Sequence, residues 1–233
     1  MPLDKAARDE LKSRAEKAKR KRSTMDTCPP VVLEFAGSPK SGKSTCIDIV
    51  SHFFKRTGFK IWAPTEGASK RTPYHLKRDL VAFNTWSLNY AISELLVAYH
   101  NVDQPDLVML DRGPFDSIAW MSLLKERKVL DDAEFRIVKD FALHPKWSAL
   151  ISRIYLFTCD PEKSLERETG SKLTAEPGIA MNTDTLTDLL AQYSALADEL
   201  EQYPIKRIDT TETKEPLPTA HEIAEDVLGL FEA

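Results

Sequence analysis

The sequence predicts an α/β protein, a three-layer sandwich in which helices cover both faces of a parallel sheet. Five short strand-like segments alternate with longer segments of helical character, which is the pattern of a parallel α/β fold. Parallel strands are covered on both faces, and the strand segments here are accordingly rich in apolar residues. The chain has 233 residues, of which 42% are hydrophobic and 29% are charged, so it can fill such a core as a soluble globular protein.

The N-terminal segment is charged and is expected to be helical over residues 3–22. An acid precedes an arginine by four residues three times in this segment, which supports a helix. The apolar side of this helix is thin, so we expect it to dock weakly or to remain in solvent. Residues 1–26 hold nine Lys or Arg against five Asp or Glu, and the net charge is −4, so the remainder carries −8. We therefore predict a basic N-terminal helix or flexible arm over residues 1–28; the alternatives are a solvated face and a nucleic-acid arm or targeting signal.

The strands are predicted from short apolar runs that end at turn residues. Cys28-Pro29-Pro30 comes just before the first of them and breaks any preceding helix. In chain order, the five strands are expected at residues 31–36, 60–63, 106–110, 153–158 and 205–209. No internal repeat is found, so residues 29–233 are predicted to form one domain.

The helices between the strands are predicted from apolar residues at helical spacing. Pro114 is expected to open one of them, because proline suits the first helical position. The segment after residue 161 starts as a helix and continues as a polar stretch to about Asn182. In chain order, these helices are expected at residues 43–56, 76–100, from 114 onward, 131–143, 161–167, 184–202 and 219–231.

Cysteine content and hydropathy favour a cytoplasmic protein. The three cysteines, Cys28, Cys46 and Cys159, cannot all pair and show no metal-ligand spacing, which suits reduced thiols. No apolar run approaches the roughly 20 residues that span a bilayer, and the charged N-terminus lacks the apolar middle of a signal peptide. The acidic body is poor support for nucleic acid as a partner.

A glycine-rich loop follows the first predicted strand and matches G-x-x-x-x-G-K-[ST] at residues 37–44. Glycines allow successive N–H groups to point into one concavity, and the start of the next helix adds its free N–H groups. The Lys43 ammonium would neutralise phosphates and the Ser44 hydroxyl would bind Mg²⁺. The sequence therefore predicts a nucleoside triphosphate site with Mg²⁺. Its expected residues are Gly37, Ser38, Pro39, Lys40, Ser41, Gly42, Lys43, Ser44 and Thr45.

Asp111 and Arg112 end the third predicted strand. Sites in parallel α/β sheets lie beyond the carboxyl ends of the strands, and an acid there can hold Mg²⁺ directly or through water. We expect Asp111 to share the metal with Ser44 and Arg112 to face the phosphates; the alternative is that Asp111 and Arg112 form a turn and pair with each other. Asp116 lies in the first turn of the next helix, where an acid is favourable for dipole reasons alone, and is predicted to be structural.

Two segments could bind an acceptor of the phosphoryl group. After the second strand, Glu66 could accept the proton of an attacking hydroxyl or hold a sugar hydroxyl, and Arg71 could clamp an anionic acceptor. In the long helix after it, Phe83, Trp86 and Tyr90 could stack on a base whose edge Asn84 reads. Aromatic residues at this spacing more often belong to the hydrophobic core than to a base pocket, and we prefer that interpretation for these three.

The polar segment at about residues 162–182 is predicted to be a mobile lid. Arg167 and Lys172 could swing onto the transferring phosphate when such a lid closes and excludes water. The alternative is an exposed helix–loop–helix.

Taken together, these segments resemble the P-loop nucleoside and nucleotide kinases, especially the thymidylate kinase-like group, over roughly residues 31–231. "LEFAGSPKSGKST" looks like the group's opening strand and phosphate loop, and "TEGASKRTPY" resembles its acceptor loop. "LDRGPFDS" is similar to its Asp-Arg motif, "ERETGSKL" to its arginine-bearing lid and "IDTTE" to its last strand. Where thymidylate kinases usually show Arg-Glu-Pro and Asp-Arg-Tyr, this chain has Thr65-Glu66-Gly67 and Asp111-Arg112-Gly113.

The resemblance implies a P-loop kinase domain with strand order 2-3-1-4-5, Mg-ATP as donor and often a homodimer. By position it implies that Lys43 and Ser44 bind phosphate and metal, that Asp111 serves the metal, and that Arg112 and Arg167 touch phosphates. With Glu66, these residues form the predicted catalytic set.

The expected activity is transfer of a phosphoryl group from Mg-ATP to a small acceptor, with a nucleoside monophosphate preferred and a nucleoside as the alternative. Rivals are a nucleotide-gated ATPase or binding module that acts through the basic N-terminal arm, and a kinase of nucleic-acid 5′ ends.

Overall fold

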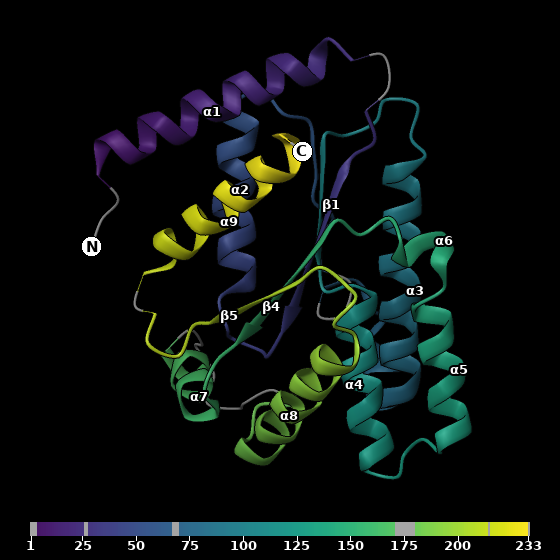
Figure 1. The fold of residues 1–233 in the computed structure, drawn as a ribbon. Coiled ribbons are helices and arrows are strands. Elements are labelled where there is room, and N and C mark those ends of the chain that lie inside the picture. Colours follow the sequence, from purple (N-terminus) through teal and green to yellow (C-terminus); the bar gives the residue numbers. More distant parts are fainter. Residues whose placement is uncertain (1–3, 26–27, 67–69, 171–179, 214, 233) are drawn as a thin grey trace.

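The structure is a computed structural model that describes residues 4–25, 28–66, 70–170, 180–213 and 215–232. Five parallel strands form one sheet in the order β2-β3-β1-β4-β5, and helices cover both of its faces (Figure 1). The strands are β1 (Val31–Gly37), β2 (Ile61–Trp62), β3 (Leu107–Asp111), β4 (Arg153–Thr158) and β5 (Ile205–Asp209). The predicted fold class and strand order are confirmed.

One face of the sheet is covered by helices from the beginning and the end of the chain. These helices are α1 (Lys5–Ser23), α2 (Lys43–Arg56) and α9 (Pro216–Glu232). Val31, Leu33 and Phe35 of β1 point to this side and share a buried cluster with the three helices. Successive side chains of a strand point to opposite faces, so Val32 and Ala36 belong to the core of the other face.

The opposite face packs against helices from the middle of the chain. The helices that contribute most of its helical core residues are α3 (Leu80–Tyr99), α4 (Pro114–Glu126) and α8 (Thr183–Glu199). The short helix α6 (Pro145–Ser148) contacts α3, and α5 (Asp132–Ala142) packs against α4. The helix α7 (Pro161–Gly170) follows β4 and contacts α8. By the alternation along β1, the side chain of Glu34 points into this second layer.

The N-terminal helix is docked more firmly than its sequence suggested. Leu11, Ala15 and Ala18 are buried against the core of the first face. Lys19 and Arg22 both bind the part-buried Asp106 before β3, at 2.7 and 2.9 Å. The expectation of weak docking fails because the short apolar stripe meets α9 directly while the basic side chains find an acid in the body of the protein.

The long predicted helix is divided in the structure. A 3₁₀ helix covers Tyr74–Arg78, and α3 begins only at Leu80. Asp79 caps α3, because its carboxylate accepts the N–H groups of Val81 and Ala82, each at 3.0 Å. The prediction of one helix from residue 76 missed this cap. The other predicted strands and helices begin and end within a few residues of their observed bounds, and α6 was not predicted.

Two further sequence expectations can be compared with the structure. All three cysteines are unpaired, and Cys46 and Cys159 are buried. Among the described residues, no helix combines the length and the hydropathy that a membrane crossing would require.

Candidate active site

The phosphate loop joins β1 to α2, and two of its backbone N–H groups are hydrogen-bonded to residues of α4 and β4. The Gly37 N–H donates to Asp116 Oδ1 at 2.9 Å, and the Ser38 N–H donates to the Phe157 carbonyl at 3.1 Å. Gly37 has φ of 130°, and a Cβ on it would lie 1.9 Å from the Phe157 oxygen, so only glycine fits there. Gly37 and Ser38 therefore anchor the loop to α4 and β4.

The rest of the loop lines an open cavity of about 730 Å³, here called the donor cavity. Gly42 caps α2 without a side-chain hydrogen bond, so no side chain competes for the first N–H groups of the helix. Those N–H groups have no intrahelical acceptor and favour an anion. The predicted loop residues that line the cavity are Pro39, Lys40, Ser41, Gly42, Lys43, Ser44 and Thr45.

Lys43 is buried within the loop. Its Nζ donates to the carbonyl oxygens of Gly37 at 2.9 Å and Ser38 at 2.7 Å. Burial and the nearby Arg112 charge lower the pKa of Lys43 to about 8, although neighbouring acids oppose this. An anion bound beside this ammonium would stabilise its charged form, as expected of a phosphate-binding lysine.

Ser44 and Asp111 meet at the edge of the donor cavity. The Ser44 hydroxyl donates to Asp111 Oδ2 at 2.6 Å, and burial raises the pKa of Asp111. No cluster of three or more His, Cys, Asp or Glu suited to a metal occurs among the described residues. Mg²⁺ on a nucleotide needs only one or two protein oxygens besides phosphate and water. A hydroxyl and a carboxylate brought together beside a phosphate loop fit that demand.

Arg112 is held between two carboxylates at the end of β3. Its Nε donates to Glu66 Oε1 at 2.9 Å, and one terminal nitrogen donates to Asp116 Oδ2 at 2.7 Å. Burial opposes the charge, but Asp116 and the other nearby anionic groups raise the pKa of Arg112 above its ordinary value. The backbone of Arg112 has φ of 68°, in the left-handed region. Arg112 is thus a permanently charged group whose orientation is fixed.

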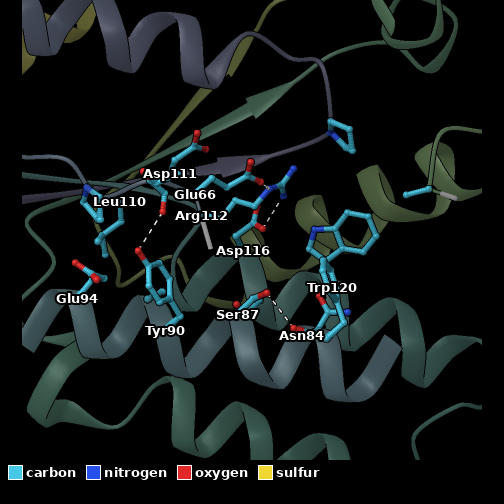
Figure 2. Close-up of a pocket in the computed structure, with 17 residues that line it drawn as sticks. Glu66, Asn84, Ser87, Tyr90, Glu94, Leu110, Asp111, Arg112, Asp116 and Trp120 are labelled. Carbon is cyan, nitrogen blue, oxygen red and sulfur yellow. Dashed lines mark hydrogen bonds and ion pairs between the residues drawn. The ribbon is translucent and has the colours of Figure 1, made fainter. Parts of the chain in front are cut away.

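A second cavity, of about 200 Å³, lies between α3 and the carboxyl end of the sheet and is here called the acceptor cavity (Figure 2). Phe83, Asn84 and Tyr90 of α3 line it together with Glu66. Phe83 and Tyr90 therefore border a cavity, against the preferred interpretation of these aromatic residues as plain core. The other described residues that line it are Pro39, Pro64, Thr65, Ser87, Ala91, Glu94, Leu110, Asp111, Arg112, Asp116, Ser117, Trp120 and Ala180.

Trp86 and Arg71 are placed differently from the rest of the predicted acceptor residues. Trp86 stacks on Tyr90 with 5.3 Å between ring centroids, and neither Trp86 nor Arg71 is among the described residues that line the acceptor cavity. Arg71 lines a neighbouring open hollow, which shares Tyr90 and Glu94 with the acceptor cavity. Its role as an anionic clamp stays a prediction.

The donor and acceptor cavities meet at one wall. Pro39, Glu66, Asp111 and Arg112 line both of them. A ligand in the acceptor cavity would therefore face a phosphate chain in the donor cavity across a carboxylate, Glu66, and a fixed cation, Arg112. This arrangement can support transfer of a group between two bound molecules.

Arg167 lies at the opposite border of the donor cavity. Its guanidinium donates to the carbonyl oxygens of Thr210 at 2.6 Å, Thr213 at 3.1 Å and Lys40 at 3.3 Å. In this position it connects the phosphate loop with the segment after β5. The lid stays a prediction, because Lys172 lies in residues 171–179, outside the described part of the chain.

Several residues around the cavities were missed by the sequence analysis. Asp116 was predicted to be structural, yet it binds Arg112 and the phosphate loop; its spacing of four residues from Arg112 was the available signal. Glu34 accepts the N–H groups of Gly113 and Asp116 at 3.1 and 2.8 Å, and Tyr193 donates to Asp116 at 2.6 Å. No local pattern marks Glu34 or Tyr193, because their partners lie far away in the sequence.

Comparison with known proteins gives a match at the level of structure only. No family model matches the sequence, and no curated protein matches it significantly. Among the similar solved structures are three of the deoxyadenosine kinase from M. mycoides. Its complex with dCTP is 16% identical over 85% of this chain and 99% of that chain, with a TM-score of 0.61.

The other two structures agree with the first. The complex with dATP is 16% identical and has a TM-score of 0.60, and it matches over 85% of this chain and 100% of that chain. The complex with the products dCMP and a flexible dCDP is 15% identical, with a TM-score of 0.61 over 85% of this chain and 99% of that chain. The resemblance to P-loop nucleoside and nucleotide kinases is thus confirmed in the fold.

Proposed function

We propose that this chain is a nucleoside kinase that transfers the terminal phosphoryl group of Mg-ATP to a nucleoside hydroxyl. The observation that carries the proposal is the shared wall of the two cavities, where Glu66, Asp111 and Arg112 lie between a phosphate loop and the acceptor cavity. The similarity of the whole fold to a deoxyadenosine kinase supports this choice of reaction class.

The charge of the acceptor cavity favours a neutral nucleoside over the nucleoside monophosphate that the sequence analysis preferred. Of its described lining residues, Glu66, Glu94, Asp111 and Asp116 are acids, and Arg112 is the one Lys or Arg. The Arg112 guanidinium is shared with Glu66 and Asp116 and would face the phosphates of the donor, so no other lysine or arginine among the described lining residues of this cavity is left for a phosphate on the acceptor. A neutral hydroxyl meets no such repulsion.

The mechanism follows from the positions of these side chains. The Glu66 carboxylate can accept the proton of the attacking hydroxyl, with its orientation set by the Arg112 Nε–H. Lys43 and Arg112 would stabilise the charge that develops on the transferred phosphoryl group. Ser44 and Asp111 would hold Mg²⁺, which neutralises charge on the phosphates when bound. Phe83 and Asn84 would position the base of the nucleoside.

Substrate identity is proposed from the same cavity and from the structural neighbours. The similar structures contain dCTP, dATP or the products dCMP and dCDP bound to the M. mycoides enzyme. Deoxynucleosides are therefore the first acceptors to test on this chain. A cytoplasmic location and a homodimer, which the resemblance and composition suggest, stay predictions.

Turnover of Mg-ATP against a panel of nucleosides and their 5′-monophosphates tests the proposal. We expect ADP and a nucleoside monophosphate to form in equal amounts with at least one nucleoside, and no turnover with the monophosphates. Glu66→Gln should lower kcat by about 10²-fold or more, since it removes the proton acceptor but keeps the size of the side chain. Turnover that requires a monophosphate, or no acceptor-dependent ADP at all, would contradict the proposal.

A further inference from the structure

A buried polar cluster joins the phosphate loop to α4 and α8, and one of its members, Asp116, also lines the acceptor cavity. Its centre is the Asp116 carboxylate, which is 2% exposed. The hydroxyl of Tyr193, a fully buried residue of α8, lies 2.6 Å from Asp116 Oδ1 and 3.2 Å from the Gly37 carbonyl. A tyrosine hydroxyl buried at this depth needs a polar partner, and here the partner is the carboxylate that also holds the active-site arginine.

Asp116 binds three parts of the molecule at once. Oδ1 accepts the Gly37 N–H of the phosphate loop at 2.9 Å and the Tyr193 hydroxyl of α8, while Oδ2 accepts the Arg112 guanidinium at 2.7 Å. Oδ1 thus binds the phosphate loop and α8, whereas Oδ2 binds Arg112. A carboxylate with one oxygen held by Tyr193 and Gly37 cannot rotate freely, so the position it offers to Arg112 is fixed.

The support for Asp116 is itself rigid. Glu34 of the central strand accepts the backbone N–H groups of Asp116 at 2.8 Å and Gly113 at 3.1 Å, which fixes the first turn of α4 on the sheet. Burial raises the pKa of Tyr193 well above its ordinary value, so the hydroxyl remains a donor throughout the working pH range. The cluster therefore reaches from β1 through α4 to α8 by direct hydrogen bonds.

We propose that Tyr193 and Asp116 are positioning residues that set the orientation of Arg112 and of the first glycine of the phosphate loop for phosphoryl transfer. The inference rests on the proposed nucleoside kinase activity. Arg112 contributes most when charge develops in the transition state, so a small loss of its alignment lowers kcat more than it raises KM. Tyr193 does not line either cavity among the described residues, so its effect must pass through the groups that its hydroxyl contacts, the Asp116 carboxylate and the Gly37 carbonyl.

Tyr193→Phe is the variant that tests this, and Tyr155→Phe is its matched control. Tyr155 is also fully buried, and its hydroxyl donates to a carboxylate, Asp226 Oδ2, at 2.7 Å, but it lies on the other face of the sheet. Both substitutions remove one buried hydroxyl and are expected to lower the melting temperature by similar amounts. Only Tyr193→Phe is expected to lower kcat, by about tenfold, with both KM values within about twofold of wild type.

A double-mutant cycle separates positioning from a general loss of stability. In the Arg112→Lys background, Tyr193→Phe should lower kcat by clearly less than about tenfold, because one of the two groups that it positions, the Arg112 guanidinium, is no longer there. An equal fold-loss in both backgrounds, or an equal loss of kcat in Tyr155→Phe, would overturn the proposal.

NMR can detect the positioning role without catalytic turnover, so this inference can be tested independently of the proposed function. In ¹⁵N NMR spectra, Tyr193→Phe should shift the Gly37 amide and Arg112 Nε–H resonances and speed solvent exchange of the latter, whereas Tyr155→Phe should leave both unchanged. If the two resonances do not move in Tyr193→Phe, the positioning role is wrong whatever the activity. If they move but wild type phosphorylates no nucleoside, the structural link stands, while the proposed function and the role in transfer fail.

Discussion

Gly113 stands where the resemblance to thymidylate kinases would place a tyrosine, and the structure gives a steric reason for the difference. A Cβ on Gly113 would lie 2.5 Å from Glu34 Cδ, because the buried carboxylate fills the space beside the first turn of α4. The Glu34 carboxylate is enclosed and takes part in the capping of α4, so it has little room to move. The buried Glu34 side chain therefore fills space that is available only because residue 113 is a glycine.

The first prediction concerns this pair. Gly113→Ala should destabilise the protein by about 1–3 kcal/mol, as expected for overpacking in a filled site. It should also lower kcat, because Arg112 precedes the displaced residue. Chemical denaturation and steady-state assays measure the two effects.

Gly229→Ala provides the control for the glycine change. Gly229 lies in α9 and is exposed, and a Cβ there meets nothing within 4 Å. Alanine should stabilise the helix by about 0.5–1 kcal/mol and leave kcat unchanged. If Gly113→Ala were as stable and as active as wild type, the described packing around Glu34 would be incorrect.

The second prediction concerns pH, and Glu34 is again the residue involved. Burial raises the pKa of Glu34 from an ordinary 4.5 to about 8, against the effect of three backbone N–H donors. Between these values the folded protein keeps a proton that the unfolded chain releases, so rising pH favours unfolding. The contribution to stability is fully present below pH 4.5 and is lost as pH rises through 8.

Glu34→Gln isolates this effect from other titrating groups. Its amide oxygen can replace Oε1, which accepts the Gly113 and Asp116 N–H groups, without a titrating proton. From pH 5 to pH 8, the free energy of unfolding should fall in wild type relative to the variant by a few kcal/mol, on the order expected for such a shift. A difference that does not change with pH would show that Glu34 is ionised throughout.

Individual residues show which parts of the candidate site could be predicted from the sequence and which could not. The position of the phosphate loop and of the Asp111-Arg112 pair beside a cavity could be predicted, because the loop motif and the strand end mark them locally, whereas their roles stay predictions. Tyr193 could not be, since its hydroxyl reaches an acid 77 positions earlier in the chain. Glu34 was treated as part of a buried strand, and its partner lies 79 positions away.

At the scale of elements, α1 gives the clearest difference between expectation and structure. The helix lies across the layer of α2 and α9 at the end of the molecule away from α7 (Figure 1). Arg14 binds Glu232 at 3.1 Å, and Arg22 lies 5.3 Å from the centre of the Phe231 ring. Part of the basic charge that suggested an interaction arm is thus used within the chain, which weakens the rival of a binding module that acts through this segment.

The third prediction is the outcome of removing residues 1–24. Loss of α1 exposes Phe59 and the apolar face of α9, so the midpoint of thermal unfolding should fall and aggregation should increase. The kcat of the protein that remains folded should match wild type, because none of the residues of α1 lines either cavity. A binding module that acted through this arm would instead lose its activity while keeping its stability.

The long helix α3 shows why local patterns did not settle the acceptor site. Phe83, Tyr90 and Leu95 are all apolar or aromatic residues of one helical segment, and the sequence pattern alone cannot tell a buried core from the wall of a cavity. In the structure, Leu95 is fully buried, while Phe83 and Tyr90 line the acceptor cavity. The difference depends on which side of α3 faces the core and which faces the cavity, and this is a property of the tertiary structure.

At the scale of the whole molecule, the parallel sheet brings the proposed site together. The phosphate loop, Glu66 and Asp111 follow β1, β2 and β3, and the carboxyl ends of parallel strands lie at the same edge. The strand order was implied by the resemblance to P-loop kinases, and this order determines which strand ends lie next to each other. The shape and charge of the acceptor cavity could not be predicted, because they depend on side chains from α3, α4 and the end of β3 together.

The most direct test of the account is a crystal structure with a bisubstrate mimic, an adenosine joined through a phosphate chain to a deoxynucleoside. The account predicts that the phosphates pass between Lys43 and Arg112, with the deoxynucleoside among Phe83, Asn84 and Tyr90 and its reacting oxygen beside Glu66. A deoxynucleoside bound outside the acceptor cavity, or a phosphate chain that avoids the loop at residues 37–44, would contradict the central claim that the two cavities form one transfer site.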